Sequence, residues 1–481
     1  MCHYCRAIMT HFDIETNIVK HFLPMTDETD NQERLKQLET MPVGRLLWTY
    51  SLPAVVGMIV MSLYNVIDRI FIGRGVGPDA ISGLAITFPV MNLATALGVL
   101  VGAGASARVS ILLGRRDRHG ASLVLGNSLV LIILNATIYI SIFGIFIDPI
   151  LRAFGASDAT LPYARDFILW LLPGLLMTNL AFSFNNIMRA SGYPRRAMLT
   201  MMLGAGINIA LAPIFIFVLG MGIKGAAIAT DIAMTASAAF VMVHFFRRDV
   251  TLHFVKGIYR LRFAVVMSIV AIGAAPALVN AAACFINVLI NNSLYTYGGD
   301  MAVGAAGIFS TYTSLLVTVV LGICQGMQPI IGYNYGAGHY SRLRRTFWLA
   351  AGVSTVICAG GEIVAMIFPS AIATAFTSDA TMISLTSTAL TMAMLVFGVV
   401  GFQIVSTTFF QSIGCAGKSI FLSLTRQVIF LIPLLMILPS QFGLKGVWMS
   451  FPSSDALATL VTAAMIIWQL RQIGRMNQRP R

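Results

Sequence analysis

The stretch SLPAVVGMIVMSLYNVIDRIFIGRGVG, residues 51–77, is apolar for most of its length and then places Asp68 directly beside Arg69. The apolar run extends back to Leu46, so it is long enough to cross a bilayer as an α-helix, which takes about 20 residues. A charged side chain in a bilayer costs at least about 2.5 kcal/mol, so such residues face protein or water and usually serve function. The stretch therefore predicts a membrane helix with a functional acid near one end.

The rest of the chain has the same apolar character. Hydrophobic residues make up 57% of the 481 residues and charged residues 11%, and the mean hydropathy is +0.82, whereas soluble proteins average about 45–50% and 25%. Alternating segments of the barrel type are absent, so we expect an all-α integral membrane protein. Twelve spans are predicted, near 46–72, 80–112, 122–147, 162–188, 197–219, 225–246, 263–290, 301–333, 346–368, 380–410, 419–439 and 445–470.

Lys and Arg are divided unevenly between the loops that follow successive spans. They crowd into loops such as LGRRDRHG, RASGYPRR and the segment 247–262. The alternate loops hold only Arg74, Arg152, Lys224 and Lys445. Because basic residues near short loops accumulate on the cytoplasmic side, we expect both termini in the cytoplasm. The same rule accounts for the net charge of +13, so a nucleic-acid partner, which needs a solvated basic face, is not expected.

The second half of the chain repeats the first. LGRRDRHG aligns with YGAGHYSR, so that Gly114 meets Gly336, and MRASGYPRRA aligns with FQSIGCAGKS, so that Gly192 meets Gly414, both 222 residues later. A repeat of this length implies two halves of six spans each. Six is an even number, so both halves enter the membrane in the same direction and form a parallel repeat.

We divide the chain at its charged segments. The expected parts are a cytoplasmic tail at 1–40, a six-helix half at 41–247, a cytoplasmic linker at 248–262, a second six-helix half at 263–471 and a cytoplasmic tail at 472–481. Met25 is an equally good start, so residues 1–24 are expected to be dispensable. The CHYC of Cys2 to Cys5 lacks a second ligand pair, so we expect no zinc site there.

Three long stretches carry a family resemblance: the opening stretch, GICQGMQPIIGYNYGAGHYSR from Gly322, and FGVVGFQIVSTTFFQSIG from Phe397. From about Pro42 to Leu470 the chain resembles a multidrug and toxic compound extrusion (MATE) transporter of the MepA-like branch. The resemblance implies a multi-pass antiporter of the bacterial inner (plasma) membrane that exports amphipathic, often cationic, organic compounds, antibiotics among them. Export would be exchanged for H⁺ or Na⁺ by alternating access between the two halves. A lipid-linked precursor flippase of the same superfamily is the alternative.

Enzyme chemistry has no support in the sequence. HExxH, GxSxG and P-loop motifs are absent, and the seven His residues are scattered, so we expect no enzymatic activity. Apart from the coupling ion we expect no cofactor. The expected partners are small organic substrates and the lipid bilayer, and we expect a monomer.

The resemblance assigns a cation-coupling site to the first half. In the family, an Asp at this place in the first helix, with a Tyr one turn earlier, belongs to that site, and Asp68 and Tyr64 match both positions. Asn208 in the fifth span and Thr230 in the sixth match two further polar members. An alternative for Asp68 is an interfacial pair with Arg69 that merely ends the span. Na⁺ at Asp68 would be the only bound metal.

One position departs from the family pattern. Many relatives carry a second Asp four residues after the Asn, where this chain has Ala212. Asp231, next to Thr230, lies at a similar depth and is our candidate for the missing acid. Two carboxylates in one poorly solvated pocket raise each other's proton affinity, which would favour proton coupling. A structural carboxylate bonded to a neighbouring helix is the alternative for Asp231.

The second half contains a different set of polar residues within its spans. Glu362 lies in the ninth span, Gln325 in the eighth and Gln403 in the tenth, and together they form a candidate second polar site. Gln side chains inside spans more often join helices than bind ligands, so the alternative is a structural role. Glu362 is ionisable, and an ionisable group inside a span is functional by default.

Overall fold

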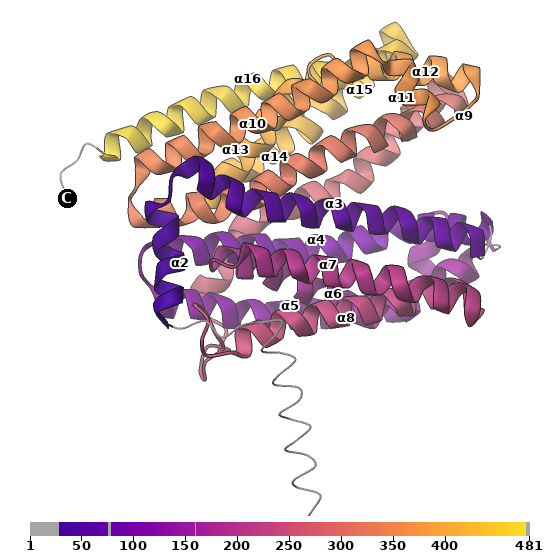
Figure 1. Ribbon diagram of the computed structural model, residues 1–481. Helices are drawn as coiled ribbons and strands as arrows, with labels where there is room; N and C mark the ends of the chain where they lie inside the picture. The colour runs from indigo at the N-terminus through magenta and orange to yellow at the C-terminus, as the bar shows by residue number, and fades with distance from the viewer. Residues whose placement is uncertain (1–27, 76–77, 159, 478–481) are drawn as a thin grey trace, which may run out of the picture.

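The computed structural model describes residues 28–75, 78–158 and 160–477, which are helical almost throughout (Figure 1). The predicted features of residues 1–24, including CHYC, lie outside these ranges. The first half of the chain forms α2 (Glu28–Thr40), α3 (Val43–Gly75), α4 (Pro78–Gly114), α5 (Arg118–Ala153), α6 (Leu161–Ala190), α7 (Pro194–Pro213), the π-helix η1 (Ile214–Val218) and α8 (Gly222–Phe246). The second half forms α9 (Phe263–Ala337), α10 (Tyr340–Ile367), α11 (Pro369–Thr374), α12 (Ala380–Ala393), η2 (Phe397–Val399), α13 (Val400–Ser412), α14 (Ala416–Leu424), the π-helix η3 (Thr425–Leu431), α15 (Ile432–Phe442) and α16 (Leu444–Asn477).

The helices of the structure agree with the all-α membrane protein predicted from the sequence. Among the described residues, ten helices are long and apolar enough to cross a membrane, or eleven when the bent pair that contains α12 and α13 is counted as one span. Helix α9 has 75 residues and would be about 110 Å long if straight. It is broken at Gly299, which has φ +66°, a backbone conformation that favours glycine. The two limbs of α9 correspond to the predicted spans 263–290 and 301–333. Counted as two spans, they would agree with the twelve spans predicted from the sequence.

The tenth predicted span, 380–410, is not one straight helix. Its two parts meet at 59°, and Val396 at the break has φ −133° and ψ 18°. A break of this kind frees backbone N–H groups inside the membrane, where no water can satisfy them. The carboxylate of Glu362 on α10 accepts one of them, the N–H of Gly398, at 2.6 Å. The sequence predicted a functional acid at this position, and the structure shows that it supports the break.

The internal repeat is visible in the backbone. Gly192 ends the turn after α6 with φ +102°, and its counterpart Gly414 follows α13 with φ +78°. Gly222, the first residue of α8, has φ +56°, and Gly443, which directly precedes α16, has φ +57°. Since L-residues with side chains rarely adopt these angles, the paired glycines fix the same turns in both halves.

The two halves pack as two layers, with α3 to α8 in one and α9 to α16 in the other (Figure 1). Glycines let helices of the two layers approach backbone to backbone. Side chains added at Gly104 or Gly273 would collide with the backbone of the opposite half, and the same holds for Gly114 and Gly336. These four glycines lie where α4 crosses the start and the end of α9.

Helix α2 lies at the end of the bundle where α3 begins (Figure 1). Leu35 and Leu38, three residues apart on one helix face, are buried, and Leu38 is fully buried. The backbone oxygen of Leu38 accepts bonds from Asn334 Nδ2 and Arg342 Nη2, both at 3.2 Å. Part of the predicted tail is thus a helix that leads into the first half and docks on α9 and α10 of the second.

Candidate functional site

Tyr64 and Asp68 lie one turn apart on the same face of α3. The Tyr64 side chain is 7% exposed and packs with Ala205 of α7 and Met234 of α8. From Tyr64 to Asp68 the helix advances by about 6 Å. This step carries the carboxyl group away from α2 and towards the opposite end of the bundle.

Asn208 and Thr230 lie on the two helices that hold Tyr64. Asn208 is 1% exposed, and its Nδ2 donates to Thr230 Oγ1 at 3.0 Å, while the Thr230 hydroxyl donates to the backbone oxygen of Ala226 at 3.0 Å. Each residue lies about one turn beyond the Tyr64 contacts Ala205 and Met234, in the same direction as Asp68. The structure therefore brings Asp68, Asn208 and Thr230 to one level of the first half.

Asp231 faces a different helix from Thr230. Its carboxylate lies against the backbone of Gly174 on α6, where an added side chain would collide with it. The contact is possible because Gly174 has no side chain. Ala212, where the family resemblance led us to expect an acid, is fully buried in the apolar cluster of the first half. Asp231 is thus close to the predicted site along α8, with its carboxylate packed on α6.

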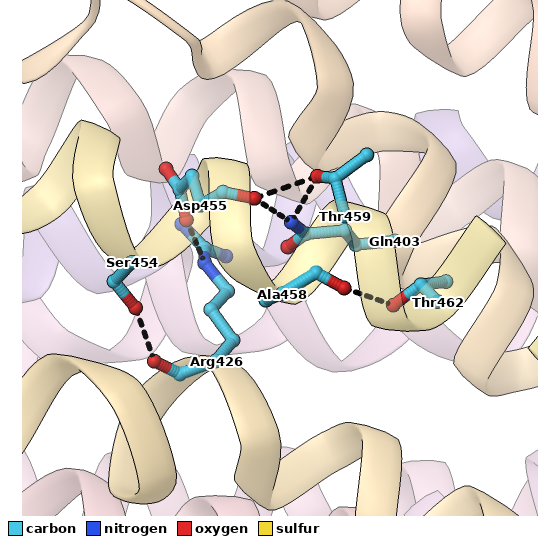
Figure 2. A network of polar contacts seen from close by, with 7 residues as sticks. All are labelled: Gln403, Arg426, Ser454, Asp455, Ala458, Thr459 and Thr462. Atoms are coloured by element: carbon cyan, nitrogen blue, oxygen red, sulfur yellow. Dashed lines mark hydrogen bonds and ion pairs between the residues drawn. The ribbon is translucent and has the colours of Figure 1, made fainter. Parts of the chain in front are cut away.

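The residues predicted for the second half occupy separate places. Gln403 Nε2 donates to the backbone oxygen of Asp455 at 2.6 Å and to Thr459 Oγ1 at 2.5 Å, so it joins α13 to α16 (Figure 2). Gln325 on α9 instead contacts the first half. Its Nε2 lies 3.3 Å from Met58 Sδ, and its Oε1 accepts a bond from Arg189 Nη1. Gln403 and Gln325 therefore stabilise two different interfaces.

Asp455 and Arg426 form an ion pair inside the second half, between α16 and η3 (Figure 2). Arg426 Nε donates to Asp455 Oδ1 at 2.6 Å, and the backbone oxygen of Arg426 accepts from Ser454 Oγ at 2.6 Å. The side chain of Asp455 is 5% exposed and that of Arg426 28% exposed. Arg426 is therefore the more accessible partner of the pair.

Two arginines were not predicted from the sequence as part of any site. Arg426 is a single basic residue inside an apolar span, and this charge within a span is its signal in the sequence, as it is for Asp68. The sequence places Arg189 in a basic loop, but the residue is 3% exposed at the end of α6, and its Nη2 donates to Asn185 Oδ1 at 2.8 Å. The run of Asn185, Asn186 and Arg189 was its signal, because amide oxygens can satisfy a buried guanidinium.

Comparisons with known proteins extend over most of the chain. The sequence profile of the MatE family matches residues 53–214 and 275–437, one block in each half. The multidrug export protein MepA of Staphylococcus aureus (strain N315) is 28% identical over 443 residues, which cover 91% of this chain and 96% of that protein. MepA of Staphylococcus haemolyticus (strain JCSC1435) is 28% identical over 445 residues, with the same coverage.

Solved structures show the same fold. The outward-facing conformation of a multidrug resistance MATE family transporter of the MOP superfamily superposes with a TM-score of 0.86 at 26% identity, covering 92% of this chain and 98% of that one. A MATE structure in the bent conformation superposes with a TM-score of 0.87 at 25% identity, covering 93% and 99%. The two blocks of the profile match include Asp68 and Asn208 in the first half and Arg426 in the second.

Proposed function

The chain belongs to the MatE family of membrane transporters, and from this premise we propose that it is an antiporter that exports amphipathic, often cationic, organic compounds in exchange for H⁺ or Na⁺. Membership of a transporter family agrees with the expectation that the protein is not an enzyme. The MepA proteins to which it is similar are multidrug exporters of bacteria. We propose the same role here, in the inner (plasma) membrane of a bacterium with both termini in the cytoplasm.

One observation carries the proposal: the halves make close contact at the end of the bundle that holds α2. Beside the glycine contacts, Gln328 Nε2 donates to the backbone oxygen of Ala103 at 3.3 Å, and Ser51 Oγ donates to that of Ile323 at 3.4 Å. These contacts lie at the α2 ends of α3, α4 and α9. With the termini cytoplasmic, the protein is closed towards the cytoplasm, which supports an outward-facing state.

Alternating access requires that these contacts break and re-form. The bond from Arg189 to Gln325 joins the two halves at the α2 end. Separation of the halves at this end would break it, so it would stabilise the outward-facing state selectively. A ligand shifts such an equilibrium only by its difference in affinity between the two states. Substrate and coupling ion would drive export if the substrate favoured one of these two states and the ion favoured the other.

The chemistry of ion coupling is assigned to Asp68. A carboxylate inside a span is costly, and protonation or a bound Na⁺ removes that cost. Asn208 and Thr230 bring amide and hydroxyl oxygens to the level of Asp68, and Tyr64 lies one turn away on the same helix as Asp68. Such oxygens are suitable partners for a proton carrier or a hard cation. Whether Asp231 contributes a second acid depends on its carboxylate leaving Gly174.

Dye accumulation in a bacterial host that lacks its own multidrug pumps tests the export function. Expression of the chain should lower ethidium accumulation and raise the ethidium concentration that the cells tolerate. An Asp68→Asn variant expressed to the same level is the matched control and should behave like the empty host. Unchanged accumulation with the parent chain, shown to be folded in the membrane, would refute the proposed substrate class.

A further inference from the structure

A cavity of about 370 Å³ lies within the second half, away from the polar level of Asp68. Both limbs of α9 line it, together with residues of η2, η3 and α16. Its apolar wall includes the aromatic rings of Phe309, Phe397 and Phe451, and two of these rings, Phe309 and Phe451, lie 5.5 Å apart. A cavity of this size with aromatic walls is suited to the apolar body of a small organic molecule.

The charged part of the lining of the same cavity is the ion pair of Arg426 and Asp455. The two partners are not equally available, because Asp455 is 5% exposed and Arg426 28% exposed. A guanidinium carries five N–H donors. Within the described part of the chain, Arg426 donates only through Nε, to Asp455. Its remaining donors are therefore free to meet a ligand.

The position of Arg426 is fixed by its surroundings. Its backbone oxygen accepts a bond from Ser454, and the backbone oxygen of Asp455 accepts from Gln403 and Thr459 (Figure 2). The bond from Ser454 joins α16 to η3 beside the pair, and the bond from Gln403 joins α13 to α16. Because the guanidinium is held in place before a ligand arrives, less conformational entropy is lost on binding.

The charge of the exposed partner selects the ligand. A planar guanidinium with two free amino groups matches the two oxygens of a carboxylate or sulfonate, and such paired bonds are among the strongest hydrogen bonds in proteins. A ligand cation would meet the same charge at close range and be repelled. We propose that this cavity binds the anionic group of an amphipathic organic acid on Arg426, with its apolar body against the aromatic wall.

The ligand-facing charge of this site is positive, whereas the acid of the first half is negative. The test measures binding and not transport, so a failed binding test would not bear on the proposed export function. The probes are 2-naphthylacetate, its neutral amide 2-naphthylacetamide, and the cation 2-(2-naphthyl)ethylammonium, titrated calorimetrically into the full chain in lipid nanodiscs. Binding of the carboxylate should be at least about tenfold tighter than that of the amide. The ammonium compound should bind more weakly than the amide.

Variants of the ion pair test whether the preference for the carboxylate depends on Arg426. Arg426→Met alone would leave Asp455 buried without a partner and could prevent folding, so the main variant combines Arg426→Met with Asp455→Leu, which leaves no buried charge. The double variant should bind the carboxylate and the amide equally. Arg152→Met, which removes an arginine from the exposed pair with Asp158, is the matched control and should bind as the parent does.

Three results would overturn the proposal. They are equal binding of carboxylate and amide by the parent, tighter binding of the ammonium compound, and a carboxylate preference that survives in the folded double variant.

Discussion

Under the proposed alternating access, removal of the docking contact of α2 should shift the protein from the proposed outward-facing state towards an inward-facing one. Arg342 of α10 donates from Nη2 to the backbone oxygen of Met41 at 2.6 Å and to that of Leu38 at 3.2 Å. Both oxygens belong to the segment that leads into the first half, whereas Arg342 belongs to the second. The substitution Arg342→Met keeps much of the apolar stem and removes both donors.

The size of the shift follows from these bonds. A hydrogen bond to a charged group contributes about 1.5–3 kcal/mol. Arg342 is only partly buried, so water can replace part of the contact, and we take about 2 kcal/mol for the pair. Since 1.36 kcal/mol is a factor of ten, the ratio of inward to outward forms should rise about thirtyfold. A parent with about 1% of the inward form would then become a variant with about a quarter.

Spin-label distance measurements can detect this change. Labels at Asp158, between α5 and α6, and at Ser378, between α11 and α12, are exposed and lie at the end away from α2. They should show a new shorter distance in the variant. Arg345→Met, on the same helix and exposed, is the matched control and should leave the distribution unchanged. An unchanged distribution in a folded Arg342→Met protein would refute the idea that α2 docking depends on the state of the transporter.

Three further outcomes are expected. Asp231→Asn should reduce gradient-driven ethidium efflux substantially, and equal transport by parent and variant from pH 6 to 8 would show that Asp68 is the only acid of the site. Gly174→Val should collide with the Asp231 carboxylate and reduce efflux by a similar factor, whereas Gly206→Ala, which meets no neighbour within 4 Å, should be neutral in the same assay. Deletion of residues 1–24 should leave membrane insertion and efflux intact, and loss of folded protein in the membrane fraction would contradict this.

Much of the fold could be predicted from the sequence because the bilayer imposes length and polarity on every span. The repeat was readable at Gly192 and Gly414, because turns that need positive φ keep their glycines. The break in the tenth span was not predicted, since Val396 and its neighbours are as apolar as a continuous helix. Its signal was Glu362, whose carboxylate accepts the N–H of Gly398.

The site was predictable in part, for a different reason. Family resemblance identified Tyr64, Asn208 and Thr230, and the bond from Asn208 to Thr230 shows that two of them meet. The direction of each side chain could not be predicted from the sequence, because the depth of a residue along its helix does not determine which neighbouring helix it faces. Asp231 has the depth of the other polar residues, yet its carboxylate lies on Gly174 of α6.

The central claim is that an ion gradient drives export through Asp68. Its most direct test is ethidium uptake into everted membrane vesicles, with a proton gradient and a sodium gradient imposed separately. The parent chain should accumulate ethidium under at least one of the two gradients and lose it when that gradient is collapsed, and the folded Asp68→Asn variant should accumulate none above empty vesicles. Gradient-driven uptake by Asp68→Asn equal to that of the parent, or no response of the parent to either gradient, would contradict the account.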